Sequence, residues 1–415
     1  MNEKDCYFDR KLYTEQLQGF INKPVIKVIT GIRRCGKSAL LELFQKDILH
    51  YTDKKHIISI NFEDTQFDTL TNYTELDGYI RSLMTDDNRY YIFLDEIQAV
   101  EQWERCVNSL RLKNTDIYIT GSNSDLLSSE LATLLSGRYV EFCLHTLSFS
   151  EFIDFRKKSG LGSDRIDDEL EAYIKTGGFP ILSTTELTPY SARKIVIDIQ
   201  NSVVLRDVIE RNNIRNVQLL QKIIAFMYDN IGNITSVKKI SDFLKSQKRT
   251  ADFETVYNYL HYLENALIIY KAPRYDVKGK KLLESYEKYY LADHSLQYTV
   301  REFNLSNISG ILENIVYMEL RRRGYTVSVG RIGGDKSGER EIDFIAENPK
   351  GKVYIQVCYL LASEETIERE FAPLLEIRDN YPKLIVTMDR FWQIEKEGVK
   401  GIHLADFLLS GTPLL

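Results

Sequence analysis

Residues 31 to 38, Gly-Ile-Arg-Arg-Cys-Gly-Lys-Ser, have the types and spacing of a loop that binds phosphate groups. Gly31 and Gly36 allow the backbone to wrap closely around phosphates with its N–H groups pointing inward. Lys37 would bridge the β- and γ-phosphates, and the Ser38 hydroxyl would ligate Mg²⁺. The segment matches GxxxxGK[ST] at every fixed position and predicts binding of ATP with Mg²⁺. We expect the nucleotide contacts to come from Gly31, Ile32, Arg33, Arg34, Cys35, Gly36, Lys37, Ser38 and Ala39.

Two adjacent acids, Asp95 and Glu96, could supply a second metal ligand and a general base, which a phosphate-binding loop does not contain. Asp95 is predicted to hold the Mg²⁺ through water, and Glu96 to orient and deprotonate the water that attacks the γ-phosphate. Two acids on a turn after a strand are also common without any such role. Their combination with the loop favours hydrolysis.

Two further side chains are candidates for the chemistry. Asn123, or Ser122 before it, could hydrogen-bond the γ-phosphate or the water, although either could instead cap the helix that follows. We favour Asn123 because its side chain reaches further. Arg138 could neutralise charge in the transition state, within one subunit or across a subunit interface, or could be an ordinary surface arginine.

These residues need strands that end at one edge of a sheet. Val25–Thr30 and Tyr90–Leu94 are apolar runs typical of strands buried on both faces, and a third strand is expected at Asp116–Thr120. A helix is expected from Ser38 onward. Because ligands bind at the carboxyl ends of parallel strands, this order predicts an α/β fold with the loop and the acids together.

The motifs "GIRRCGKSALL", "YIFLDEIQ", "YITGSNS", "LSGRYVEF", "LSFSEF" and "GGFP" occur in this order. Together they resemble a large prokaryotic family of AAA-type P-loop ATPases that carry a C-terminal domain of unknown function. The resemblance spans essentially the whole chain. It implies the roles given above for Lys37, Ser38, Asp95 and Glu96, and makes Arg138 a better candidate for phosphate sensing.

The composition is that of a globular protein with two or three domains: 415 residues, 43% hydrophobic and 27% charged. No signal peptide or membrane-spanning run is apparent, and five scattered cysteines argue against a disulfide framework or zinc site, so we expect a cytoplasmic protein without membrane contact. Residues 191 to 290 carry a net charge of +6, whereas the rest carries −12. A basic middle is compatible with a polyanionic partner.

Residues 191 to 300 predict a winged-helix domain, with helices at Val217–Asn230, Val237–Ser246 and Ala251–Ala266 followed by a hairpin. The third helix is a poor reader of DNA bases, because it carries acids and no arginine. Basic residues around it could still hold phosphates: Lys245, Lys248, Arg249, Lys278, Lys280 and Lys281. A packing role for this domain is an equal alternative.

Residues 301 to 415 have the element order of a restriction-endonuclease-like core. Glu313 and Asp343 match the helix acid and the strand acid of active members, but Gln356 and Cys358 stand where glutamate and lysine belong. A neutral amide is a weak Mg²⁺ ligand, and a thiol cannot replace the lysine. We therefore expect a degenerate domain that serves for binding or docking and lacks nuclease activity.

The predicted protein is thus a Mg²⁺-dependent ATPase with three parts: an AAA-type domain with a helical closing segment over residues 1–190, the winged-helix domain and the degenerate domain. Hydrolysis would be coupled to nucleic-acid association or remodelling, with DNA bound by the basic middle. The alternative is a regulatory switch that assembles with a protein partner through the C-terminal domain. A homo-oligomer is compatible with either.

Overall fold

The computed structural model describes residues 8–122, 135–249, 251–333, 340–390 and 395–411. The chain forms two compact units. The first ends at Thr146 and also takes in Asn265–Leu267, and the second starts at Leu147. The predicted boundaries of functional domains at residues 190 and 300 stay predictions. No helix of the described residues is long and apolar enough to cross a bilayer.

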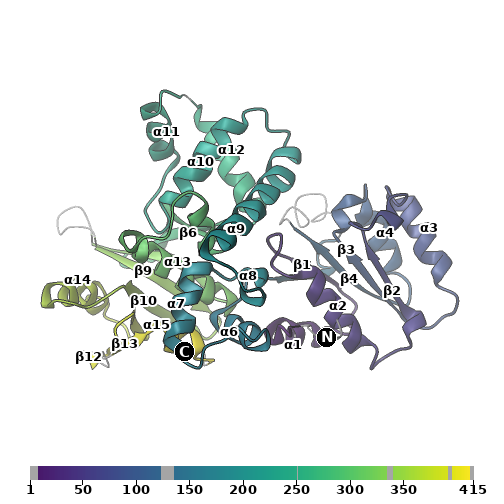
Figure 1. Cartoon of the computed structure of the whole chain (residues 1–415), viewed down its shortest axis with the longest axis horizontal. Helices are drawn as coiled ribbons and strands as arrows, with labels where there is room; N and C mark the ends of the chain where they lie inside the picture. Colours follow the sequence, from purple (N-terminus) through teal and green to yellow (C-terminus); the bar gives the residue numbers. More distant parts are fainter. Residues whose placement is uncertain (1–7, 123–134, 250, 334–339, 391–394, 412–415) are drawn as a thin grey trace. The chain divides into compact units, whose positions relative to one another are not determined.

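The first unit is built on a five-stranded sheet (Figure 1). Its strands are β1 (Ile26–Thr30), β2 (Ile57–Asn61), β3 (Tyr90–Asp95), β4 (Thr115–Gly121) and β5 (Tyr139–Cys143). All neighbours are parallel and the order is β2-β3-β4-β1-β5. The helices of this unit are α1 (Lys11–Gln18), α2 (Lys37–Ile48), α3 (Tyr73–Leu83) and α4 (Trp103–Leu110). Because β4 lies between β1 and β3, the loop after β1 and the acids after β3 share one edge with the end of β4.

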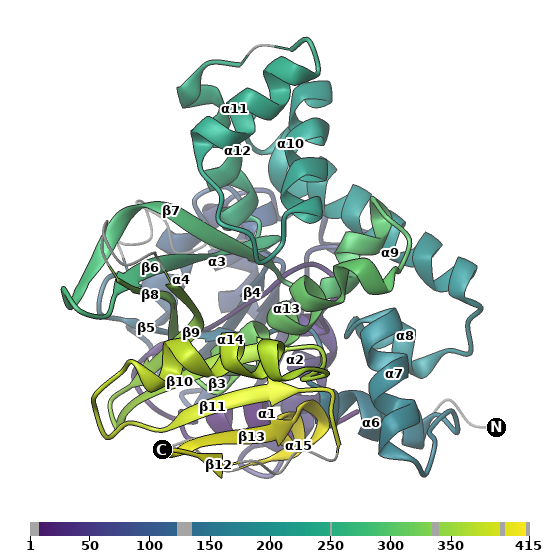
Figure 2. The same cartoon turned by 90° about the vertical axis from the view of Figure 1, so that its left-hand side faces the viewer.

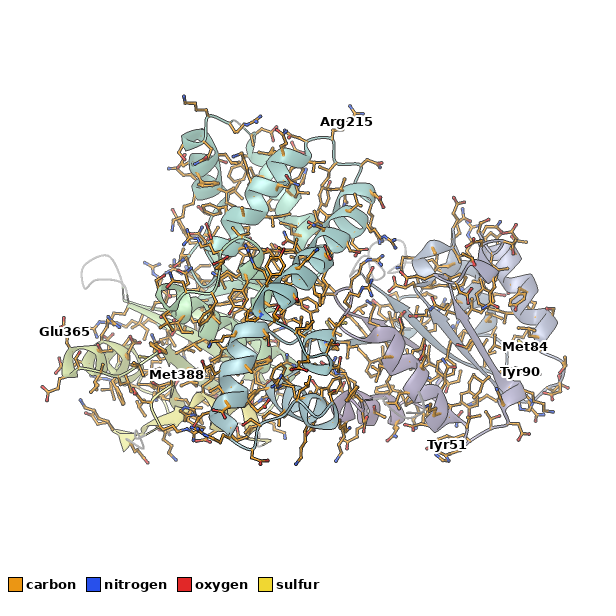
Figure 3. All side chains as sticks on the ribbon, in the orientation of Figure 1. Tyr51, Met84, Tyr90, Arg215, Glu365 and Met388 are labelled. Atoms are coloured by element: carbon orange, nitrogen blue, oxygen red, sulfur yellow. The ribbon has the colours of Figure 1, made fainter. Side chains whose placement is uncertain are left out.

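Every residue of β1 and β3 is buried, so these central strands are covered on both faces of the sheet. One charged pair lies within it: Lys27 on β1 contacts Asp116 on β4, and both side chains are almost fully buried. Burial lowers the pKa of Lys27, and the Asp116 charge opposes this shift. Tyr90 lies at the start of β3 (Figure 3). Its hydroxyl accepts the Thr85 N–H at 2.9 Å.

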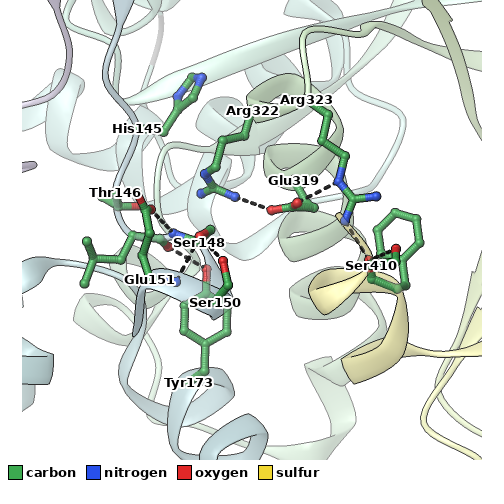
Figure 4. Close-up of polar contacts among 12 residues, drawn as sticks. His145, Thr146, Ser148, Ser150, Glu151, Tyr173, Glu319, Arg322, Arg323 and Ser410 are labelled. Carbon is green, nitrogen blue, oxygen red and sulfur yellow. Dashed lines mark hydrogen bonds and ion pairs between the residues drawn. The ribbon is translucent and has the colours of Figure 1, made fainter. Parts of the chain in front are cut away.

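The second unit begins with helices α6 (Phe149–Lys158), α7 (Ile166–Thr176), α8 (Pro180–Thr184) and α9 (Pro189–Val203), which a π-helical segment (Val204–Glu210) extends. Ser148 starts α6 with a capping box, in which its hydroxyl accepts the Glu151 N–H and the Glu151 carboxylate accepts the Ser148 N–H (Figure 4). Tyr173 on α7 donates its hydroxyl to the Leu147 carbonyl at 3.0 Å.

Three helices and a hairpin follow: α10 (Val217–Asp229), α11 (Val237–Ser246), α12 (Phe253–Asn265), β6 (Ile269–Asp276) and β7 (Lys281–Leu291). These elements lie close to the predicted ranges, whereas their assignment as a winged helix stays a prediction. Arg215 is exposed in the turn before α10 and points into solvent (Figure 3). The hairpin forms one edge of a larger sheet, because β6 pairs in parallel with β8 (Thr326–Ile332) (Figure 2).

That sheet has eight strands in the order β12-β13-β11-β10-β9-β8-β6-β7. Its other strands are β9 (Arg340–Asn348), β10 (Gly351–Cys358), β11 (Lys383–Thr387), β12 (Glu395–Lys396) and β13 (Val399–His403). Helices α13 (Ile308–Arg322), α14 (Glu364–Leu375) and α15 (Leu404–Leu409) pack against it. On α13, Glu319 accepts hydrogen bonds from Arg322 and Arg323, and Arg323 also donates to the Phe407 carbonyl of α15 (Figure 4).

Candidate nucleotide-binding site

The loop between β1 and α2 has a backbone that only glycine fits at its two ends. A Cβ on Gly31 would lie 2.3 Å from the Leu144 carbonyl oxygen, and Gly36 has a φ of 103° where α2 starts. Between them the Cys35 thiol is fully buried, and burial raises its pKa. Cys35 is therefore a small buried residue of the turn, as a thiol held neutral is a poor nucleophile.

Lys37 is the first residue of α2 and is only 5% exposed. Its Nζ donates to the Gly31 carbonyl at 2.9 Å and lies 3.6 Å from Oε1 of Glu96. The ammonium thus spans the loop and faces the acid predicted to activate water.

Ser38 and Asp95 are brought into direct contact. The Ser38 hydroxyl hydrogen-bonds the Asp95 carboxylate, which also accepts the Thr120 hydroxyl from the end of β4. Burial raises the pKa of Asp95, and these two hydrogen bonds oppose the shift. A serine hydroxyl beside a buried carboxylate is an oxygen donor set that fits Mg²⁺, with phosphate oxygens and water completing the shell.

Glu96 adopts a left-handed backbone conformation, with φ of 55°. Its N–H donates to the Thr120 hydroxyl oxygen at 3.0 Å, and its carboxylate accepts a hydrogen bond from Gln98. Such a conformation is costly for a residue with a side chain and persists where surrounding contacts enforce it. Here it keeps the carboxylate beside Lys37 at the carboxyl edge of the sheet.

The two arginines of the phosphate loop are placed differently. The Arg33 guanidinium lies 3.3 Å from Glu63 and 3.9 Å from Glu96, whereas Arg34 is exposed. The loop backbone turns the Arg33 side chain toward acids that follow β2 and β3. Of the other loop residues, Ile32 has a buried side chain and Ala39 is exposed on the first turn of α2.

Sequence reasoning missed two residues that fix this site. Thr120, the second-last residue of β4, contacts the Asp95 carboxylate and the Glu96 N–H. The only signal for it in the sequence was a hydroxyl residue near the end of the neighbouring strand. Arg10 is 3% exposed and donates to the carbonyls of Cys35 at 3.1 Å, His145 at 2.8 Å and Thr146 at 3.3 Å. It ties the phosphate loop to the segment after β5, and no local pattern could have indicated this.

The structure does not place the other predicted site residues beside Lys37, Asp95 and Glu96. Asn123 lies outside the described residues, and Ser122 is buried at the end of β4. Arg138 precedes β5, at the amino edge of the sheet, and donates to the Asn108 side chain at 3.2 Å. Because β1 and β5 are parallel, the phosphate loop lies at the opposite edge. The role of Arg138 in phosphate sensing stays a prediction.

A second group of charged residues lies in the other unit. Lys288 on β7, with a side chain 3% exposed, has its Nζ 2.6 Å from Glu341, 3.2 Å from Glu313 and 3.6 Å from Asp343. Burial alone would lower the pKa of Lys288, but the three acids raise it. Burial raises the pKa of Asp343 and Glu313. The predicted helix and strand acids therefore meet, around a lysine that the sequence did not single out.

Gln356 and Cys358 on β10 complete the comparison with a nuclease site. The Gln356 side chain accepts the Asp343 N–H at 3.3 Å and donates to Glu370 at 3.0 Å. Both ends of its amide are therefore hydrogen-bonded to other residues of the protein. Burial raises the pKa of Cys358 to about 12, which keeps the thiol uncharged. Within the described ranges, no group of three or more histidine, cysteine or acidic residues has the arrangement of a metal site.

Comparison with known proteins identifies the first unit. Residues 23–153 match a family model described as an AAA domain, and residues 167–307 match a domain of unknown function (DUF8612). An uncharacterized protein of Haemophilus influenzae is 38% identical over 97% of this chain and 98% of its own length. The chain belongs to the AAA family. An uncharacterized protein of Methanocaldococcus jannaschii is 34% identical, over 83% of this chain and 77% of its own length.

Among solved structures, the Walker-type ATPase PABY2304 of Pyrococcus abyssi is similar in fold. It is 17% identical, with a TM-score of 0.52 over 71% of this chain and 96% of that chain. The predicted α/β AAA-type fold is confirmed. The restriction-endonuclease-like assignment of the C-terminal part stays a prediction.

Proposed function

We propose that the protein hydrolyses ATP at the carboxyl edge of the five-stranded sheet. The observation that carries this proposal is one connected set of contacts: Lys37 faces Glu96, and Thr120 joins Glu96 to Asp95. A phosphate loop alone would account for binding. Hydrolysis also requires a carboxylate that can reach a water at the γ-phosphate, and Glu96 lies at the same edge of the sheet as the loop lysine.

Each residue has a role that follows from its place. The loop amides and Lys37 would bind the phosphates, and Ser38 and Asp95 would hold Mg²⁺, which supplies neutralisation of phosphate charge when bound. Glu96 would accept a proton from the attacking water. At the same time the water oxygen would bond to the γ-phosphorus, and the bond from the γ-phosphorus to the leaving ADP would break. Thr120 would act as a positioning residue, because it holds the backbone of Glu96 and the carboxylate of Asp95.

Lys37 and Glu96 change partners in this scheme. The Lys37 ammonium bonds to the Gly31 carbonyl and faces Glu96. A γ-phosphate would draw Lys37 away and leave the Glu96 carboxylate available to water.

The test is Glu96→Gln. We expect the rate of ATP hydrolysis to fall by about 10²–10⁴-fold, because the amide cannot accept the proton, whereas ATP affinity is retained. Glu101→Gln, an exposed glutamate after the same turn, serves as the matched control and should hydrolyse normally. Normal turnover in Glu96→Gln would remove Glu96 as the base.

We further propose that hydrolysis is coupled to nucleic-acid association through the second unit. The support is the excess of six positive charges over residues 191–290 in a chain of net charge −6. Measuring ATPase activity with and without single-stranded and duplex DNA tests this coupling. Stimulation that declines steeply with salt is expected, and no binding at low salt would refute it.

The second candidate is a nucleotide-controlled switch that assembles with a protein partner. The exposed acidic residues Asp252 and Glu254 on or beside α12 favour it, because they would repel DNA phosphates from the predicted recognition helix. An ATP-dependent change in partner assembly, with no effect of DNA on turnover, is its expected signature.

A further inference from the structure

A groove of about 1010 Å³ lies in the second unit and is lined by residues of the β6–β7 turn, β10 and α14. This volume lies at the upper end of the range of about 300–1,000 Å³ that small-molecule sites occupy. Its lining combines tyrosines and basic residues, and those that carry the inference are Tyr275, Tyr354, Tyr381, Lys278, Lys280 and Arg378. Neither the phosphate loop nor the Lys288 group contributes to it.

The tyrosines surround Lys352. Its Nζ lies 5.1 Å from the ring centroid of Tyr275, 5.9 Å from that of Tyr381 and 6.0 Å from that of Tyr354, and it pairs with Glu347 at 2.5 Å. Tyr354 is 2% exposed and donates its hydroxyl to Asp379 at 2.7 Å, which fixes this ring in the groove wall. Tyr381 is 44% exposed and offers an aromatic surface to a ligand.

The charges of the groove are unequally satisfied. Its acids are already paired, since Glu376 contacts Arg340 at 2.6 Å and Asp379 accepts hydrogen bonds from Tyr354 and Lys383. By contrast, the side chains of Lys278, Lys280 and Arg378 contact no acid in the part of the chain that the structure describes. The rim therefore carries positive charge that the protein leaves uncompensated.

We propose that this groove binds single-stranded nucleic acid, an inference that rests on the proposed nucleic-acid function and locates its binding surface. The three rim cations contact backbone phosphates, and an unpaired base stacks on Tyr381. In a duplex, each base is stacked inside the helix and its face is closed to a side chain. An exposed aromatic ring beside free cations therefore favours a single strand.

The experiment is fluorescence anisotropy of the full-length protein with labelled oligothymidylate and oligouridylate, measured over a range of salt concentrations. Tyr381→Ala should weaken binding by about 5- to 100-fold at fixed salt, because stacking on one base is lost. The triple variant Lys278→Gln, Lys280→Gln and Arg378→Gln should lower the slope of log K against log salt by about 2, since each phosphate contact contributes about 0.7.

Two controls carry changes of the same kind away from the groove. Tyr51→Ala removes another exposed tyrosine (Figure 3), and Lys396→Gln with Lys400→Gln removes two exposed lysines of the β12–β13 edge. Native-like binding by the controls and weakened binding by the groove variants support the inference. If the native protein and the groove variants bind alike, the groove is not the site, although the proposed function survives. If the native protein binds neither oligomer at low salt, both fail.

Discussion

At the scale of single residues, Thr120 is the side chain on which the candidate active site depends most. Its hydroxyl is a donor to Asp95 and an acceptor for the Glu96 N–H, so one group sets the positions of the predicted metal ligand and the predicted base. The left-handed conformation of Glu96 is held in part by this contact. A change at Thr120 should therefore alter the chemistry more than the fold.

We expect Thr120→Val, which keeps the shape and removes the hydroxyl, to lower kcat for ATP by about 10- to 100-fold, since hydrogen bonds to charged groups contribute about 1.5–3 kcal/mol. Thr120→Ser should restore most of the rate. Measurement of kcat and KM for both variants checks this, together with thermal unfolding. A fall in kcat that serine does not rescue would contradict the proposed hydrogen-bonding role.

Lys288 is the corresponding single residue of the second unit. Three carboxylates surround its buried ammonium, so Lys288→Met would leave their charges uncompensated. We expect the free energy of unfolding to fall by about 3–5 kcal/mol, measured by denaturant titration. Adding Asp343→Asn to Lys288→Met should recover part of the loss.

Lys175→Met is the matched control, because Lys175 pairs with Glu171 on the surface of α7 and such pairs contribute about 0–1 kcal/mol. Equal effects of the buried and the surface substitutions would show that Lys288 does not compensate the acids.

The residues that the sequence predicted correctly as neighbours are those within a contiguous motif or at successive strand ends. Lys37, Ser38, Asp95 and Glu96 meet because parallel strands bring their carboxyl ends to one edge. Arg10 and Lys288 were missed because their partners are far away in sequence, at separations of 135 residues for the Arg10–His145 contact and 25 for the Lys288–Glu313 contact. Only tertiary packing reveals such contacts.

At the scale of elements, the hairpin β6–β7 shows where sequence reasoning stops. The alternation of apolar residues predicts both strands, but it does not say which strand lies beside them. The structure pairs Arg274 of β6 in parallel with Val329 of β8, so the hairpin that follows α12 continues the C-terminal sheet. This pairing joins the predicted winged-helix segment and the predicted nuclease-like segment within one compact unit.

Glu264, near the end of α12, makes this element sensitive to pH. Burial raises the pKa of Glu264 to about 7; Lys271 lowers it, and Glu287 raises it. Because the folded pKa lies above the unfolded value of about 4.5, the folded state binds the proton more tightly. The free energy of unfolding should therefore fall as pH rises from about 4.5 to 7, by at most about 3 kcal/mol from this group.

Glu264→Gln should remove this part of the pH dependence. Denaturant titration of both proteins at pH 5 and pH 8 checks the prediction: the variant should gain stability relative to the native protein mainly at pH 8. An equal difference at the two pH values would show that Glu264 does not titrate in this range.

At the scale of the whole molecule, the position of Arg138 bears on assembly. β5 separates this arginine from the edge that holds the phosphate loop, and five residues of strand span roughly 16 Å. An arginine at the amino edge is thus poorly placed to serve the site of its own sheet. If it does sense phosphate, the nucleotide in question would belong to a neighbouring copy of the chain.

This hypothesis predicts complementation between two inactive variants. Arg138→Ala retains Glu96, and Glu96→Gln retains Arg138, so a mixed assembly would contain interfaces that pair an intact base with an intact arginine. We expect each variant alone to hydrolyse ATP slowly and the mixture to regain a measurable fraction of the native rate. A mixture of Lys37→Ala and Glu96→Gln is the control, because both changes affect the same side of the interface and Arg138 is intact in each. Recovery in this control would point to another cause of the regained rate, whereas no recovery in the Arg138→Ala mixture, with assembly verified by sedimentation, would argue that Arg138 does not act across the interface.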